Sequence, residues 1–393
     1  MFSRRTPDSL AQNRLSEALA CRRRAGLPVL DLTRTNPTQC GIELPGQAIL
    51  AALGDSRVLS YEPEPKGWRG AREAVAAHHA AQGARIDPDR LFLTASTSEA
   101  YSWVFKLLCD PGDEVLVPRP SYPLFECLGA LDGVAVRGYP LHPELDWAIG
   151  RDEIESQITG RTRAILLVNP NNPTGSFVHE EDWRYLTDLA ERRHLAIVSD
   201  EVFFDYLLDG AARPVSALSL ESEALVLTLS GLSKIAALPQ MKMGWMHVGG
   251  GAALVREACE RLEWIADAYL PVSAPVLYAA PQWLDLAVQA RSAVLERCRA
   301  VQAVSGEVCA GASAVRPRRV EGGWSLVLEG PRTPAGSDLA LQLLEKTGVL
   351  VQPGYYYDFA REGFVVTSLL TPLAEARGGA QALHRYWTRP SDF

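Results

Sequence analysis

The stretch "LSGLSKIAALPQMKMGWM" (Leu229–Met246) consists mostly of apolar and small residues, yet it contains two lysines, Lys234 and Lys242. Lysine is rarely buried unless it has a partner or a task. An apolar run precedes Lys234 and ends in small residues, which is typical of a buried strand that stops at a turn. The stretch therefore predicts a lysine at the end of a buried strand.

Short apolar runs alternate with helical stretches on both sides of this lysine, from about residue 48 to residue 250. The pattern predicts strands at Leu91–Thr94, Glu114–Val117, Val134–Tyr139, Ala164–Val168, Ala196–Ser199, Leu225–Leu229 and Gly244–Val248. Helices are predicted between several of them, for example over Glu99–Cys109 and Glu181–Arg193. Strands that are apolar on both faces and separated by helices indicate an α/β domain with a mostly parallel, seven-stranded sheet.

The chain changes its pattern after Gly251. We expect helices over Ala252–Ala266, Ala287–Val304 and Leu373–Trp387, and strands near Trp324–Glu329, Val349–Val351 and Phe364–Leu369. A further helix is predicted near the N-terminus, with Ser9 as its N-cap and Gly26 as its stop. The expected parts are residues 1–47, an N-terminal helix and arm that contribute to a small domain; residues 48–275, a large α/β domain; and residues 276–393, a small C-terminal α+β domain.

The composition is that of an ordinary globular protein: 47% hydrophobic and 22% charged residues, with a formal charge of −8. This charge gives no electrostatic footprint for nucleic acid or an anionic membrane. Seven scattered cysteines without a C-x-x-C pair, and histidines without ligand spacing, predict reduced thiols and no metal site. No apolar signal segment or membrane-length run occurs. We therefore expect a cytoplasmic protein without nucleic acid or membrane partners.

Polar motifs follow three consecutive predicted strands. "NPNNPTG" (169–175) follows one strand, "DEVFFDY" begins with Asp200 after the next, and "SGLSK" ends with Lys234 after the third. Each motif alone could be a turn, a helix cap or a surface lysine. Open α/β sheets bind ligands at the carboxyl ends of their strands, so the three motifs together indicate one site.

A lysine and an acid at one site are what pyridoxal 5′-phosphate (PLP) requires. The lysine holds the aldehyde as a Schiff base, and the acid keeps the pyridine nitrogen protonated, which makes the ring a better electron sink. PLP also requires donors for its phosphate group and a planar group that stacks on the ring. The site therefore predicts PLP as the cofactor.

The chain resembles the class I/II aminotransferases, PLP enzymes of fold type I, over nearly its whole length. The resemblance implies that Lys234 forms the Schiff base and that Asp200 pairs with the pyridinium nitrogen. Asn172 in "NPNNPTG" would bind the ring hydroxyl, and Tyr122 in "RPSYPLF" would stack on the ring.

The resemblance also implies a phosphate site. Ser96 and Thr97 in "LTASTSEA" would cradle the phosphate at a helix N-terminus, where the backbone N–H groups favour an anion. Lys242 stands where the family usually has an arginine, which keeps the charge but loses the bidentate fork. The serine that the family commonly has three residues before the Schiff-base lysine is a glycine here, so Ser230 or Ser233 is expected to supply that hydroxyl.

Two further positions follow from the resemblance. Tyr61 in "SYEPEPKGWRGAR" matches a tyrosine that reaches the phosphate of the neighbouring subunit, which implies a homodimer with shared active sites. Phe203 stands where the family often has a tyrosine that donates to the ring oxygen. The missing hydroxyl predicts a Schiff base with a raised pKa, which Asn172 offsets in part.

The residue expected to bind the substrate carboxylate differs from the family pattern. The arginine that grips the α-carboxylate of the substrate aligns with Val366 in "GFVVTSLLTP". Arg34 and Asn36 in "DLTRTNPT" and Arg361 in "DFAREGF" are candidate substrate-binding residues, because both segments flank the site in the family.

The resemblance implies an aminotransferase that moves an amino group between an amino acid, or a related amine, and a 2-oxo acid by ping-pong chemistry. The freed Lys234 would be the general base. A first alternative is another PLP reaction, such as elimination, decarboxylation or cyclisation. Val366 favours this alternative, because the arginine that usually binds the substrate carboxylate is missing at that position. A second is a non-catalytic PLP-fold module that binds a ligand, against which Lys234 and Asp200 both argue.

Overall fold

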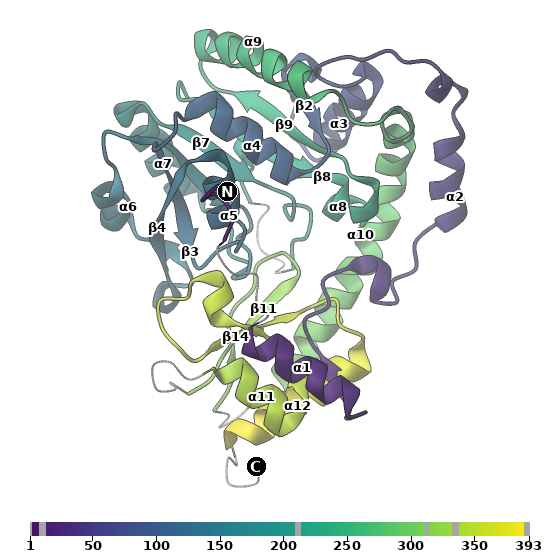
Figure 1. Ribbon diagram of the computed structural model, residues 1–393, viewed down its shortest axis with the longest axis vertical. Helices are drawn as coiled ribbons and strands as arrows, with labels where there is room; N and C mark the ends of the chain where they lie inside the picture. Colours follow the sequence, from purple (N-terminus) through teal and green to yellow (C-terminus); the bar gives the residue numbers. More distant parts are fainter. Residues whose placement is uncertain (1, 8–12, 209–213, 311–313, 332–337, 389–393) are drawn as a thin grey trace.

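The computed structural model describes residues 2–7, 13–208, 214–310, 314–331 and 338–388, arranged in two lobes (Figure 1). The large lobe contains an extended sheet with helices packed around it. The small lobe lies below it in Figure 1 and contains α1 (Arg14–Arg24), α11 (Leu339–Thr347) and α12 (Leu373–Thr388) beside a smaller sheet.

The large sheet has eight strands in the order β2-β9-β8-β7-β6-β3-β4-β5. Their bounds are β2 Leu91–Thr94, β3 Glu114–Arg119, β4 Ala135–His142, β5 Ala148–Ile149, β6 Thr162–Val168, β7 Ala196–Asp200, β8 Val226–Gly231 and β9 Gly244–Gly249. The strands from β8 to β4 are parallel, whereas β9 is antiparallel to both its neighbours and β5 to β4. The predicted α/β fold is confirmed, but the sheet has one strand more than predicted, because two residues are too few to produce a periodic pattern.

Both faces of the sheet are buried, which explains the uninterrupted apolar runs. Val115 and Leu166 pack on one face, and Leu116 and Ile165 pack on the other. The first face is covered by α4 (Thr97–Leu108), α5 (Phe125–Asp132) and α9 (Ala252–Tyr269), and the second by α6 (Arg151–Gln157) and α7 (Glu180–Arg193). Because helices cover both faces of the sheet, a ligand can reach the central strands only at their ends.

The helix α10 (Ala274–Val308) extends for 35 residues and is shared by both lobes. Its first part packs with α2 (Gly46–Ala51) and α3 (Arg69–Ala81) of the large lobe, and its second part joins the core of the small lobe. The prediction began this helix at Ala287, but it continues through Pro281, a residue type that usually ends a helix pattern. The domain boundary after residue 275 stays a prediction.

The small lobe is built on a four-stranded sheet of order β10-β11-β14-β13. Its strands are β10 Arg316–Pro317, β11 Ser325–Glu329, β13 Gln352–Pro353 and β14 Phe364–Ser368, while β1 (Leu30–Asp31) pairs with β12 (Val349–Leu350). The helix α1 is capped by Asn13, whose Oδ1 accepts a hydrogen bond from the Ser16 N–H at 2.8 Å. The predicted cap Ser9 lies outside the described residues.

Within the described residues, none of the helices combines the length and apolarity needed to cross a membrane. No group of three or more His, Cys, Asp or Glu side chains in this part of the chain is arranged to hold a metal ion. All seven cysteines are free thiols.

Candidate active site

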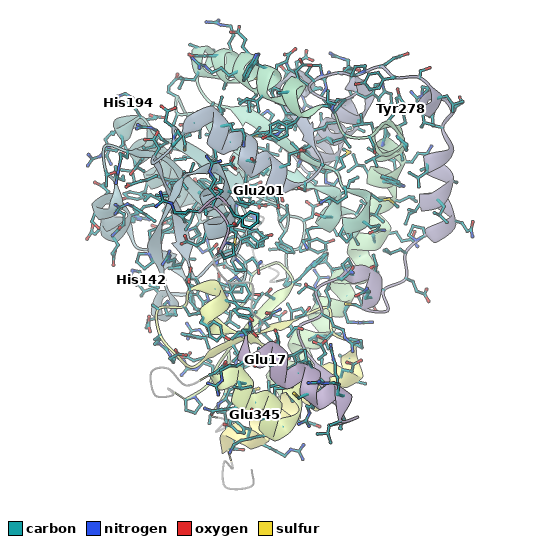
Figure 2. All side chains as sticks on the ribbon, viewed as in Figure 1. Glu17, His142, His194, Glu201, Tyr278 and Glu345 are labelled. Atoms are coloured by element: carbon teal, nitrogen blue, oxygen red, sulfur yellow. The ribbon has the colours of Figure 1, made fainter. Side chains whose placement is uncertain are left out.

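A cavity of about 250 Å³ lies at the carboxyl ends of β6, β7 and β8, and we call it the central pocket. Most of the cofactor residues predicted from the sequence line it: Ser96, Thr97, Tyr122, Asn172, Asp200, Phe203, Ser233, Lys234 and Lys242. Figure 2 labels Glu201, the neighbour of Asp200, near the middle of the molecule. The sheet therefore brings together residues that lie far apart in the sequence, such as Ser96 and Lys242.

Asp200 is the last residue of β7 and is buried at the pocket wall. Its Oδ2 accepts a hydrogen bond from the Tyr101 hydroxyl at 3.0 Å, and its Oδ1 accepts one from the Val202 N–H at 3.1 Å. Burial raises the pKa of Asp200 to about 6, although these hydrogen bonds and Lys234 oppose the shift. The carboxylate is therefore fixed in orientation and ionised at neutral pH.

Lys234 lies in α8 (Leu232–Ile235), directly after β8. Its Nζ is 4.9 Å from the ring centroid of Trp324 and 5.3 Å from that of Phe203. Burial lowers the pKa of Lys234, and the negative charge of Asp200 opposes the shift. A lysine with a lowered pKa supplies more of the neutral amine, which is the form that acts as a nucleophile or a base.

Asn172 and Tyr122 each have a neighbour that restricts the side chain. Asn172 follows β6, and its Oδ1 accepts a hydrogen bond from the Ser325 hydroxyl at 3.2 Å. Tyr122 packs edge-on against Phe125, with 5.7 Å between the ring centroids. An amide and an aromatic ring thus stand in the same pocket as the lysine and the acid.

One end of the pocket suits a phosphate group. Ser96 caps α4: its Oγ accepts from the Glu99 N–H at 3.2 Å, while Glu99 accepts from the Ala95 N–H at 2.6 Å. A Cβ on Gly244 of β9 would lie 3.1 Å from the Thr97 nitrogen, so glycine permits the strand to approach this helix terminus. With Lys242 at the rim, the helix N-terminus forms a site for an anion.

The structure does not bring Ser230 or Tyr61 into the pocket lining. The Ser230 hydroxyl donates to the backbone oxygen of Glu201 at 3.4 Å, on the far side of β8. Of the two serines proposed to supply the hydroxyl, Ser233 in α8 lines the pocket and Ser230 in β8 does not. Tyr61 is 76% exposed on the surface of the chain.

The two candidate arginines are held by carboxylates elsewhere. Arg34 lies 3.2 Å from Glu375 of α12, and Arg361 lies 2.5 Å from Glu329 of β11. Neither lines the central pocket. The sequence alone gives no sign of these ion pairs, because their partners are far along the chain or across a sheet.

The other two candidate substrate residues also have structural contacts. Asn36 caps a short 3-10 helix, and its Oδ1 accepts from the Thr38 N–H at 3.1 Å. Val366 is buried in β14 opposite Val327, inside the core between the two lobes. The position aligned with the family arginine is therefore filled by core packing.

Three residues near the site were missed from the sequence: Tyr101, Trp324 and Ser325. Tyr101 lies four residues after Thr97, on the same face of α4, so the helical period could have indicated it. Trp324 and Ser325 reach the pocket residues Lys234 and Asn172 from the small lobe, and no local pattern reports such a contact.

The chain matches known proteins over most of its length. The family model for aminotransferase class I and II matches residues 31–372. Glutamate-pyruvate aminotransferase AlaA of Escherichia coli K12 is 30% identical over 255 residues, which are 65% of this chain and 63% of that protein. The chain thus spans less than two thirds of that relative's length. Arginine--pyruvate transaminase AruH of Pseudomonas aeruginosa is 30% identical over 350 residues, 85% of each chain.

Solved structures share the fold. The alanine aminotransferase from Pyrococcus furiosus superposes with a TM-score of 0.85 at 23% identity, covering 99% of this chain and 100% of that one. A tyrosine aminotransferase from Leishmania infantum gives a TM-score of 0.83 at 19% identity, covering 98% and 99%. The chain belongs to the class I and II aminotransferase family, and PLP is the cofactor implied by that family and by the pocket residues.

Replacing Lys242 with alanine is expected to weaken PLP binding by roughly 3- to 10-fold, because an exposed charge near a phosphate contributes about 1 kcal/mol. The loss should shrink at high salt, since salt screens exposed charges. Fluorescence titration of the apoprotein with PLP at two salt concentrations measures it. Lys242→Arg serves as the matched control and should bind at least as tightly; equal affinity of the alanine variant would contradict the assignment.

Binding of PLP is expected to weaken as pH falls through about 6, where Asp200 gains a proton and loses its charge. Tyr101→Phe removes a hydrogen bond to the ionised form, so the pKa of Asp200 rises and this midpoint moves up by about one pH unit. PLP titrations between pH 5 and pH 8 check this. The control is Tyr139→Phe, a buried tyrosine that donates to the Leu166 oxygen; identical midpoints in all three proteins would refute the link.

Proposed function

We propose that the protein is a PLP-dependent aminotransferase that transfers an amino group between an amino acid, or a related amine, and a 2-oxo acid in two half-reactions. The observation that carries this proposal is that Lys234 and Asp200 line one pocket together with Asn172 and Tyr122. Such a pocket supplies an amine, an anion, an amide donor and an aromatic ring, which are the groups that PLP requires.

PLP, when bound, supplies a carbonyl carbon that links to amines and a ring that accepts the electron pair from the substrate carbon. Lys234 Nζ would hold PLP and would serve as the base that takes the proton from the substrate α-carbon. Burial lowers the pKa of Lys234, which increases the fraction of the neutral amine that this step needs. Asp200 would keep the ring nitrogen protonated, Tyr122 would pack on the ring, and Asn172 would donate to the ring oxygen.

The names of two relatives narrow the range of candidate amino acceptors. Glutamate-pyruvate aminotransferase AlaA and arginine--pyruvate transaminase AruH both have pyruvate as a substrate by name. We therefore propose pyruvate as the first amino acceptor to test, with alanine as the product. We further propose that the protein works in the cytoplasm as a homodimer, in which the exposed Tyr61 reaches the pocket of the second subunit.

A second candidate function is another PLP reaction, such as elimination, decarboxylation or cyclisation. It is favoured by one observation: none of the described residues that line the central pocket is an arginine. Among the described lining residues, the α-carboxylate of an amino acid therefore finds no arginine that could bind it in a bidentate way. A donor without that carboxylate, or a reaction other than transfer, would suit such a pocket.

The test is a half-reaction screen. The PLP-loaded protein is mixed with single amines and amino acids, and the products and the cofactor spectrum are followed before and after pyruvate is added. An aminotransferase converts the cofactor to its amine form with a donor alone and then produces alanine. Ammonia, carbon dioxide or a cyclic product without that conversion would establish the second candidate, and PLP uptake without turnover would indicate a binding module.

A further inference from the structure

A segment of the small lobe is docked on the "NPNNPTG" loop of the large lobe. The backbone N–H groups of Glu321 and Gly322 donate to the Gly175 oxygen at 3.1 and 2.9 Å. Gly175 has a φ of +71°, and a Cβ there would lie 2.6 Å from the Gly322 oxygen, so glycine is required at this contact. The docking places the start of β11 beside Asn172.

In the structure, the Asn172 amide faces Ser325 with its oxygen. The Ser325 Oγ lies 3.2 Å from the Asn172 Oδ1, and because an amide oxygen only accepts, the serine hydroxyl is the donor. No described residue accepts a hydrogen bond from the Asn172 Nδ2 group, and Asn172 lines the central pocket. The carbonyl branch of the amide is therefore occupied, and its NH₂ branch is left for a ligand in the pocket.

The amide orientation matters more in this chain because a neighbouring donor is missing. Phe203 stands at the position where a tyrosine hydroxyl would donate to the ring oxygen, and its ring instead packs edge-on against Trp324 at 5.3 Å. The charge on the ring oxygen then depends on Asn172 to a larger extent.

We propose that Ser325 is a positioning residue that holds the Asn172 amide with its NH₂ group toward the ring oxygen of PLP. The small lobe then takes part in setting the charge of a cofactor that the large lobe binds. This inference rests on the cofactor role proposed for Asn172.

The proposal predicts a spectroscopic effect. A donor at the ring oxygen withdraws charge from the ring and lowers the pKa of the Lys234-linked cofactor, so a freely rotating amide should raise that pKa. For Ser325→Ala we expect an increase of about 0.5–1 pH unit in the midpoint of the absorbance titration. The titratable groups that line the pocket around the linkage are Lys234 itself, Asp200, Tyr122 and Lys242, and this substitution changes none of them.

The experiment compares matched variants by absorbance titration of the PLP-loaded protein. Ser325→Thr keeps a hydroxyl and should titrate like the wild type. Ser325→Val has the shape of the threonine variant but lacks the hydroxyl, so its midpoint should match that of Ser325→Ala. Asn172→Ala should shift at least as far, and adding Ser325→Ala to it should change nothing more. Ser368→Ala is the control, because Ser368 lies opposite Ser325 in β14 and its Oγ accepts from the Leu370 N–H.

The outcomes separate the two proposals. If Asn172→Ala shifts the titration but Ser325→Ala and Ser325→Val both titrate like the wild type, the role of Ser325 is overturned and the cofactor site stands. A shift that is equal in Ser325→Thr and Ser325→Val would show a packing effect and would also overturn it. If the wild type shows no pH-dependent absorbance with PLP, the proposed function itself fails, and the inference with it.

Discussion

Replacing Lys234 with alanine is expected to abolish transamination, with turnover falling by at least about 10⁴-fold. The substitution removes both the proposed covalent attachment point of PLP and the proposed base. No other described lysine except Lys242 lines the central pocket, and Lys242 is exposed at its rim. Alanine production from pyruvate and a set of donors measures the loss, and mass spectrometry after borohydride reduction shows whether PLP is still attached to the protein.

Lys66 provides the control for this substitution. It pairs with Glu263 at 3.2 Å, away from the pocket lining, so Lys66→Ala should keep near-normal turnover and cofactor attachment. A small added amine, such as methylamine, should restore part of the proton transfer in Lys234→Ala, since it can occupy the space of the missing side chain. Retention of turnover above one per cent in Lys234→Ala would contradict the proposed roles.

The second large effect is expected for Asp200→Asn, which should lower turnover by about 10³-fold. The substitution keeps the size of the side chain and an acceptor for Val202, but it removes the negative charge that we propose pairs with the ring nitrogen of PLP. Preorganised charges at such places are worth about 10²–10³-fold in rate each, and the loss of the ring proton adds to this. Turnover and the pH dependence of the cofactor spectrum are the measurements.

Glu201→Gln is a matched control, because Glu201 is a buried carboxylate next in sequence. It lies outside the lining of the central pocket, and its oxygens accept from Ser216 at 2.5 Å and from the Ala217 N–H at 2.8 Å. Burial raises the pKa of Glu201 to about 7, so an amide replaces a group that is partly neutral already. Equal losses in the two variants would show that a buried charge in this region serves stability rather than catalysis.

The sequence predicts the large lobe well because its central strands are buried on both faces. Each such strand is an apolar run with a turn at its end, and parallel topology brings those ends together. This is why Asp200, Asn172 and Lys234, which lie on separate segments, could be assigned to one pocket. The same pattern does not predict β5, because two residues are too few to show a period. It also does not predict the first part of α10, because that part contains Pro281.

The substrate side of the site was less predictable for a physical reason. Arg34 and Arg361 were candidates by their positions along the chain, but ion pairs with Glu375 and Glu329 hold them elsewhere. Contacts of this kind depend on how the small lobe is placed on the large one, which no local periodicity encodes. The hydrogen bond from Ser325 to Asn172 belongs to the same class.

The long helix α10 has a mechanical consequence. It extends for about 50 Å, and its first half is anchored by Trp283, whose indole N–H donates to the Ile49 oxygen at 3.0 Å. Its second half is anchored by Val294 and Cys298 in the other core. Because one continuous helix packs into the cores of both lobes, unfolding of either lobe removes packing contacts from the helix that the other lobe shares. We therefore expect a single unfolding transition in scanning calorimetry. Two separated peaks would show that the lobes unfold independently despite the shared helix.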